Sequence, residues 1–370
     1  MRFNHIFKLT NENKTHREYK CNNVNINIDF ISDSALRVAV FNDNAKMLPT
    51  FTVNPNNNLS SLGRSRLSTD GFDCVAPVVE KFDNKEQFVL ACGVTVDLDL
   101  NNFILSYSKE SKFLFGDRPP LAYNFEGEFG NGPYHYITRE DDEHIFGLGD
   151  KSGLINKAGR VYRIETADSM GFDAEKTDPL YKHVPFYICE NSVGAYGIYY
   201  DTTDTSFVDL GREINNYYCH FKYFKTDDDC LVYYVFFGNK LSVLQQYARL
   251  CGKQAFPPKW SFDYCGSTMA YTDAPDAQNQ MQNFLDKIKD LDLSCGGFYL
   301  SSGYTSIGNL RCVFNWNYDK FPNPKKFVAD YNNAGIHLTD SLQLATEEVP
   351  HATSGIFGSV IVNDKMKVTS

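Results

Sequence analysis

The pattern of hydrophobic and polar residues changes at about residue 240. Before that point short runs alternate with period two, as where Val24, Ile26 and Ile28 are separated by polar residues. Such alternation is typical of strands that are buried on one face. Many short strands, joined by Asn, Asp and Gly turns with no convincing helix between them, predict an antiparallel β-sandwich over residues 1–250.

After residue 240 the hydrophobic residues recur with the period of a helix. The stretch "KLSVLQQYARLCG" (240–252) places Leu241, Leu244 and Tyr247 on one helical face and ends at Gly252, a residue that commonly terminates helices. We therefore expect a helix over 240–252 that packs through this face.

Beyond residue 255 strands and helices are predicted to alternate. Strands are expected at "KWSFDYCGS" (259–267), "GGFYLSS" (296–302) and "IHLT" (336–339), and helices at "DAPDAQNQMQNFLDKIKDLDL" (273–293) and "NPKKFVADYNNAG" (323–335). In the first helix Asp273 is a candidate cap, and Met281, Leu285 and Leu291 belong to the predicted buried stripe. This order indicates parallel βαβ units over 255–339. Residues 340–370 do not continue it.

Chain length and net charge limit the number of domains and the kinds of partner to be expected. A chain of 370 residues exceeds what one hydrophobic core usually spans, so two domains are expected. The formal net charge is −10. Nucleic acids and anionic membranes require a basic face, so neither is expected as a partner. Neutral ligands such as sugars remain compatible with this composition.

The cysteines and the N-terminus give an expectation for the cellular compartment of the protein. Ten cysteines are scattered along the chain with no C-x-x-C pair, which favours neither a zinc site nor a disulfide framework. No signal-peptide pattern is evident, and no segment reaches roughly 18 consecutive apolar residues. We therefore expect a cytoplasmic protein with reduced, mostly buried thiols and no metal or other cofactor.

Five stretches together resemble one enzyme family. They are "HIFGLGDKSGLINKAGRVYRIETADS" (144–169), "DPLYKHVPFYI" (178–188), "GAYGIYYDTTDTSFVDLG" (194–211), "QQYARLCGKQAFPPKWSFDYCGSTMAYTD" (245–273) and "FNWNYDKFPNPKKFVADYNNAGI" (314–336). In content and in order they are similar to motifs of glycoside hydrolase family 31, the α-glucosidase family. The resemblance begins at residue 140 and ends at about residue 338.

The resemblance implies an N-terminal antiparallel β-sandwich followed by the first βα units of a (β/α)8 TIM barrel. It further implies exo-acting hydrolysis of α-glycosidic bonds with retention, on a carbohydrate that carries a terminal α-linked sugar. Two carboxylates perform that reaction. The family nucleophile belongs to the fourth barrel strand, and no matching motif occurs here. The expectation is an incomplete barrel, truncated from a longer gene, without hydrolase activity of its own.

Alternatives remain open at this point. The sandwich could serve as a non-catalytic module that binds carbohydrate or a protein partner. Within the family, a lyase or transglycosidase would use the same nucleophile with a different second step. The sequence does not determine the oligomeric state.

The resemblance also points to binding residues. Asp168 matches an Asp on a sandwich loop that reaches over the family's pocket; its alternative is an ordinary loop residue, since Ser, Met and Gly follow it. The family's second barrel strand ends in D-x-D-Y, and alignment through Tyr304 places Ser301 and Gly303 where the two acids stand. Because serine offers weaker contacts to sugar hydroxyls than a carboxylate, and glycine none, glucose specificity does not carry over.

Trp316 follows the strand tip and is a candidate sugar platform, with core packing as its alternative. For the strand tip itself, the alternative is a polar turn without a binding role. The predicted substrate-binding residues are Asp168, Ser301, Ser302, Tyr304 and Trp316.

Overall fold

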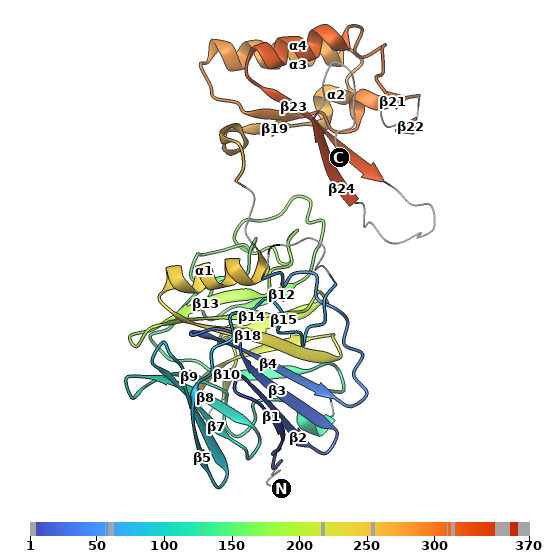
Figure 1. Cartoon of the computed structure of the whole chain (residues 1–370). Helices are drawn as coiled ribbons and strands as arrows, with labels where there is room; N and C mark the ends of the chain where they lie inside the picture. Colours follow the sequence, from blue (N-terminus) through green and yellow to red (C-terminus); the bar gives the residue numbers. More distant parts are fainter. Residues whose placement is uncertain are drawn as a thin grey trace. The chain divides into compact units, whose positions relative to one another are not determined.

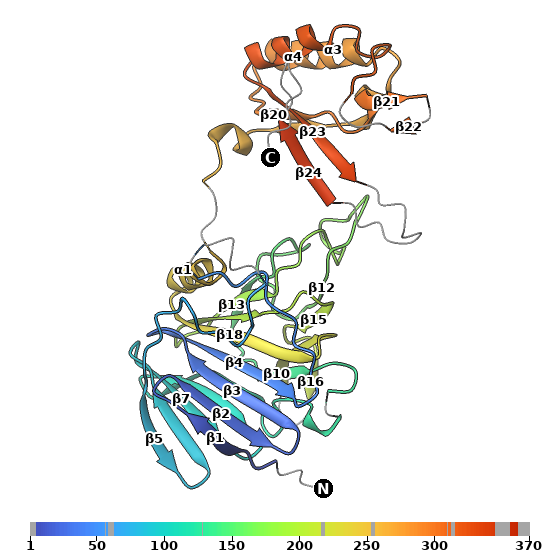
Figure 2. The ribbon, with the colours of Figure 1, turned by 45° about the vertical axis from the view of Figure 1, so that its right-hand side comes forward.

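The structure is a computed structural model that describes residues 5–55, 57, 63–127, 129–215, 219–252, 256–308, 310–311, 315–344 and 356–361. The chain divides into two compact units, residues 1–254 and 255–370. Figures 1 and 2 show the ribbon from two sides.

The first unit is built around one antiparallel sheet of eight strands. In spatial order these are β1 (Lys8–Glu12), β2 (His16–Cys21), β3 (Val24–Phe30), β4 (Ala35–Asn42), β18 (Cys230–Gly238), β14 (Ala195–Tyr200), β13 (Phe186–Glu190) and β11 (His144–Gly147). Strands from both ends of the unit therefore meet at its centre, where β4 pairs with β18.

Strand β18 shows why the sequence folds in this way. Its "CLVYYVFF" run is apolar throughout and every one of these residues is buried. Leu231 and Tyr233 belong to one core cluster, whereas Val232 and Tyr234 belong to another on the opposite face. A continuous apolar run, rather than an alternating one, is typical of a central strand that is covered on both faces.

Two further sheets cover one of these faces with side chains of the first cluster. One has the order β5 (Val78–Phe82), β6 (Lys85–Val89), β7 (Val94–Asp99), β8 (Ile104–Lys109) and β9 (Lys112–Gly116). The other has the order β10 (Tyr134–Thr138), β17 (Cys219–Thr226), β15 (Ser206–Asp209) and β12 (Val161–Ile164), with β16 (Ile214–Asn215) also paired to β17, and a 3-10 turn, η2, spans Phe125–Gly127. The predicted antiparallel sandwich is confirmed.

Helix α1 (Lys240–Cys251) covers the other face, where it contacts β13, β14 and β18 (Figure 1). Its extent agrees with the prediction, but the predicted packing face was wrong. Leu241 and Leu244 are 64% and 49% exposed, whereas Val243 and Leu250 are buried. Tyr247 does pack inward, with its ring stacked on a sheet aromatic at 3.9 Å between centroids.

The second unit contains the expected parallel strands. Strands β19 (Cys265–Ser267), β20 (Gly297–Tyr299) and β23 (His337–Leu344) pair in parallel, and β24 (Ile356–Ile361) pairs antiparallel with β23. The helices are α2 (Met269–Asp273), α3 (Ala277–Asp290) and α4 (Pro324–Asn333). The short elements are η3 (Lys259–Phe262), η4 (Gly303–Thr305), β21 (Ser306–Ile307) and β22 (Leu310–Arg311).

Helices α3 and α4 lie side by side over the same face of the parallel strands in both views (Figures 1 and 2). Met281 and Leu285 of α3 and Phe327 of α4 share a core with Phe298 of β20. Helices that connect parallel strands and pack on one face are typical of βα barrel segments. The βαβ prediction is confirmed in the second unit.

Three local predictions in this unit were wrong. The first part of 259–267 is the 3-10 turn η3 rather than strand, because Pro257-Pro258 leads directly into it. Asp273 closes α2, and α3 begins only after its N-cap residue Asp276. Leu291 lies past the end of α3 and is exposed.

The cysteine prediction is correct only in part. Eight cysteines are free among the described residues, but only Cys189, Cys230 and Cys295 are buried, and the other five are half-buried. Within the described part of the chain, no helix is long and apolar enough to cross a membrane.

Candidate functional site

The tip of β20 explains the missing carboxylate at position 303. A Cβ at Gly303 would lie 2.5 Å from the backbone carbonyl carbon of Thr272 and 2.7 Å from the backbone nitrogen of Asp273. Atoms at such distances clash, so only glycine fits here. The close approach of α2 to the tip therefore excludes an acidic side chain at this position.

The other tip residues fall into two environments. Ser301, in the left-handed backbone region at φ 57°, and Ser302 are half-buried. Tyr304 and Trp316 are only 1% and 9% exposed, and their rings meet edge to face at 4.8 Å. These aromatic side chains belong to the core of the second unit, the environment described by the packing alternative for Trp316. The two serines form the accessible part of the tip.

Ionic contacts hold the tip from the side. Lys320 Nζ donates to Ser306 Oγ at 3.0 Å and lies 3.7 Å from a carboxylate oxygen of Asp273. A carboxylate is therefore present beside the tip, but α2 supplies it instead of β20. Sequence analysis missed this placement because it assigned Asp273 to the start of the next helix.

Asp168 lies in the first unit, on an exposed loop that follows β12. Its carboxylate Oδ1 accepts a hydrogen bond from the Tyr181 hydroxyl at 2.9 Å. This bond to Asp168 raises the pKa of Tyr181. The loop is fixed near Asp168, since Ala167 N donates to Leu180 O at 3.1 Å and Ser169 Oγ to Pro179 O at 2.6 Å. Asp168 is thus an accessible carboxylate on a well-anchored backbone.

Asp178 anchors the base of this loop. Its carboxylate accepts from Lys151 Nζ at 2.7 Å and from the backbone nitrogen of Arg163 at 2.5 Å. The Asp178–Pro179 peptide is cis. Several large apolar side chains on the segments that it joins are exposed, namely Leu154, Ile155, Met170 and Phe172. The loop combines the Asp168 carboxylate with exposed apolar side chains, which suits a sugar or a protein chain.

A cavity of about 580 Å³ opens beside the same loop in the first unit. Its lining residues are Thr52, Glu165, Thr166, His183, Pro185, Tyr199, Thr202, Thr203, Thr205 and Tyr247. They come from five separate stretches of the chain, so no local motif indicated them. The mix of hydroxyls, one carboxylate and one imidazole suits a polar neutral ligand.

The residues behind this cavity form a buried polar network. Arg66 Nη1 lies 2.6 Å from Asp228 Oδ2, which also accepts from the Thr202 hydroxyl at 2.8 Å. Asp201 accepts from Thr50 at 2.7 Å, and burial raises the pKa of its carboxyl. This network fixes Thr202 from below. Over the described residues, no group of His, Cys, Asp and Glu side chains is arranged to hold a metal ion.

Family comparisons agree with both units. The family model described as "Glycosyl hydrolase 31 N-terminal galactose mutarotase-like domain" matches residues 25–209. The model "Glycosyl hydrolases family 31 TIM-barrel domain" matches residues 254–363, beyond position 339 where the sequence motifs end. The chain belongs to glycoside hydrolase family 31. The resemblance inferred from the motifs is confirmed, and the strands of the second unit are the beginning of a family 31 TIM barrel.

The sequence identity to individual relatives is low. The chain is 26% identical to Alpha-glucosidase 2 of Bacillus thermoamyloliquefaciens over 246 residues, which cover 66% of this chain and 29% of that protein. It is 24% identical to Alpha-xylosidase of Saccharolobus solfataricus over 327 residues, 86% of this chain and 40% of that protein. This family 31 chain therefore spans less than half of the length of either relative.

The fold comparison is consistent with this assignment. The Flavobacterium johnsoniae GH31 dextranase FjDex31A, solved as a mutant complexed with isomaltotriose, matches with a TM-score of 0.70 at 22% identity. The match covers 90% of this chain and 37% of the dextranase chain. A GH31 alpha-xylosidase from a soil metagenome, complexed with xylose, has a TM-score of 0.66 at 14% identity over 92% of this chain. At these identities the likeness concerns the fold.

Proposed function

We propose that this chain supplies the sandwich and the first barrel strands of an exo-acting α-glycosidase. The complete enzyme would hydrolyse the bond to a terminal α-linked sugar with retention. The observation that carries the proposal is the pair of consecutive family 31 matches, one on each compact unit. The named relatives include an α-glucosidase and an α-xylosidase, which supports the substrate class.

We further propose that the 370-residue chain alone does not turn over substrate. A retaining glycosidase needs two carboxyl groups about 5–5.5 Å apart at the strand ends. Strand β19 ends at Ser267, and β20 is followed by Leu300 and Ser301. The nearby carboxylate of Asp273 is engaged with Lys320. The described ends of β19 and β20 thus offer neither nucleophile nor acid.

Substrate contacts are assigned to the two accessible groups of polar side chains. Asp168 would accept hydrogen bonds from sugar hydroxyls, with Tyr181 fixing its orientation. Ser301 and Ser302 would contribute hydroxyl contacts at the β20 tip. With serine and glycine replacing the family's two acids, this tip would hold a sugar less tightly than a carboxylate pair.

Two measurements on the purified 370-residue chain test the proposal. Hydrolysis of 4-nitrophenyl α-glucoside and α-xyloside is expected to stay at the blank rate, and turnover above it would refute the proposed inactivity. Saturation-transfer NMR with maltose, isomaltose and methyl α-xyloside is expected to detect binding of at least one of them. Loss of affinity in Asp168→Asn, but not in Asp150→Asn, would support Asp168. If no sugar of this panel binds, the carbohydrate assignment is wrong.

A non-catalytic role for the sandwich is the second candidate. It is favoured by the completeness of the first unit, whose two core clusters use only residues up to Leu250. The Asp168→Asn comparison discriminates the two candidates. Binding that this substitution leaves unchanged, together with blank-rate hydrolysis, would favour the module.

A further inference from the structure

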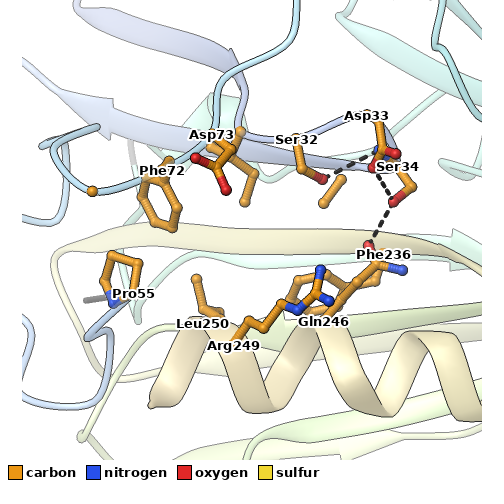
Figure 3. A pocket seen from close by; sticks show the side chains of 13 residues that line it. Ser32, Asp33, Ser34, Pro55, Phe72, Asp73, Phe236, Gln246, Arg249 and Leu250 are labelled. Carbon is orange, nitrogen blue, oxygen red and sulfur yellow. Dashed lines mark hydrogen bonds between the residues drawn. The ribbon is translucent and has the colours of Figure 1, made fainter. Parts of the chain in front are cut away.

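The first unit contains a second cavity, of about 170 Å³, away from the Asp168 loop (Figure 3). Five separate stretches of the chain build it. Its lining comprises residues 31–35, Pro55, residues 71–73, Phe236, Gln246, Arg249 and Leu250. None of these residues belongs to the site described above, so this cavity requires its own explanation.

The floor of the cavity is apolar. Ile31, Phe236 and Leu250 are all buried in the cluster between the large sheet and α1. Phe72 is half-buried at one end, where it packs near Tyr234 at 6.4 Å between ring centroids. A ligand in this cavity would therefore place a nonpolar face on the floor, and removing that face from water would favour binding.

The polar groups of one wall are fixed by hydrogen bonds. Gln246 Nε2 donates to Phe237 O at 2.9 Å, and its Oε1 lies 3.2 Å from the Ser34 hydroxyl. That hydroxyl also lies 2.7 Å from Asp33 Oδ1, and Ser34 N donates to Ser32 Oγ at 3.2 Å. Together these contacts, of which Figure 3 draws those among Ser32, Asp33, Ser34 and Gln246 as dashed lines, hold an amide, two hydroxyls and a carboxylate in place before any ligand binds.

Two charged side chains face the cavity without partners. Asp73 and Arg249 lie on opposite sides of it in Figure 3. Neither makes a hydrogen bond or an ion pair with any other residue that the structure describes. A carboxylate acceptor and a guanidinium donor are thus available across a narrow space.

We propose that this cavity binds one neutral pyranose ring, such as the terminal unit of an oligosaccharide. A sugar ring has a nonpolar C–H face for the floor and hydroxyls that both donate and accept, which match the carboxylates, the guanidinium and the fixed amide. The volume suits a single ring, because pockets for larger drug-sized ligands measure about 300–1,000 Å³. Asp33 and Asp73 against Arg249 leave a net negative lining, which disfavours an anion.

The proposal does not depend on the proposed glycosidase function, and a test can separate the two. Binding of methyl α-D-glucopyranoside to the full 370-residue chain is measured by saturation-transfer NMR in an Asp168→Asn background, which removes the carboxylate contact proposed for the loop after β12. We expect saturable binding. Substituting Asp73→Asn or Arg249→Gln is expected to lower the affinity about tenfold, since each removes a charge-assisted hydrogen bond.

Matched controls carry the same chemical changes outside the cavity, namely Asp150→Asn and Arg212→Gln, which should leave the affinity unchanged. Because Asp73 and Arg249 are exposed, the variants should keep the thermal unfolding midpoint of the parent. Absence of saturable sugar binding, or equal affinity in all variants, would overturn the proposal. Preferential binding of the zwitterion glycine over the glycoside would also overturn it, because the charged pair would then be the recognition element.

Discussion

At the residue scale, one feature of the sandwich core is a fully buried ion pair. Lys222 Nζ lies 2.5 Å from Glu143 Oε2 and 2.6 Å from the Tyr196 hydroxyl, which itself donates to Glu143. The side chains of Lys222 and Glu143 are 1% and 0% exposed. Charges at this depth persist only because each satisfies the other.

Replacing Lys222 with Met should therefore be strongly destabilising. The substitution leaves the Glu143 carboxylate buried without a counter-charge, and we expect a loss of about 3–5 kcal/mol in the free energy of unfolding. Urea denaturation of the two proteins, followed by circular dichroism, measures the difference. The double variant Lys222→Met, Glu143→Leu should recover most of it. A loss below about 1 kcal/mol in the single variant would show that the pair is dispensable.

A histidine on β2 gives a pH-dependent contribution. His16 Nδ1 lies 2.7 Å from Asp29 Oδ1, and its Nε2 lies 2.9 Å from Glu18 Oε1. The hydrogen bond to Asp29 is the main cause that raises the pKa of His16, against the opposing effect of burial. Protonated His16 therefore stabilises the folded state. That stabilisation is complete below the unfolded-state pKa of about 6.5 and is lost as the pH rises through the raised folded-state pKa.

The variant His16→Gln should reveal this dependence. We expect the parent to be more stable than the variant at pH 5.5 and the difference to shrink steadily towards pH 8.5. Urea unfolding at several pH values measures it, with His144→Gln, an exposed histidine that forms no ion pair among the described residues, as the control. A difference independent of pH would mean that His16 acts through packing alone.

At the element scale, the packing of α1 on the large sheet depends on one glycine. A Cβ at Gly197 of β14 would lie 2.5 Å from Val243 Cγ1 and 3.1 Å from the Phe186 ring. We expect Gly197→Ala to lower the free energy of unfolding by about 1–3 kcal/mol, because overpacking forces the helix away from the sheet. Thermal and urea unfolding measure the change.

A double-mutant cycle tests the cause. Val243→Ala alone should be destabilising because it leaves a cavity, whereas combined with Gly197→Ala it should cost less than the sum of the two. Gly194→Ala serves as the comparison, since a Cβ there would meet only Leu114 at 3.7 Å. If the two changes in the free energy of unfolding simply add, the destabilisation by Gly197→Ala does not arise from its contact with Val243.

The same contact shows what the sequence could predict. The extent of α1 followed from its periodicity and from Gly252, but the apolar residues cover a broad side of this helix, so periodicity alone did not select which of them pack on the sheet. The close approach at Gly197 selects Val243, and Leu250 is buried on the same side of the sheet. Similarly, the strand tip at 301–304 was located correctly, whereas the reason for Gly303 lies in α2, which the sequence analysis did not identify as a helix.

At the scale of the whole molecule, motif order gave the architecture but not the cavities. Five short stretches were enough to assign the family and the order of sandwich and barrel segment, because such motifs are local in sequence. The two cavities combine residues as distant as Thr52 and Tyr247, or Ser34 and Gln246. No local pattern indicates such pairs, so the candidate sites beyond the family motifs came from the structure alone.

The separation of the cores leads to a prediction about folding. The buried residues of the first unit form two clusters that end at Leu250, and those of the second unit form one cluster that begins at Ala277. Residues 1–254 expressed alone should therefore fold cooperatively, with the same transition temperature in calorimetry as one transition of the 370-residue chain. The smaller second unit should give a separate transition at lower temperature. One common transition in the full chain, together with aggregation of residues 1–254, would show that the sandwich needs the barrel segment to fold.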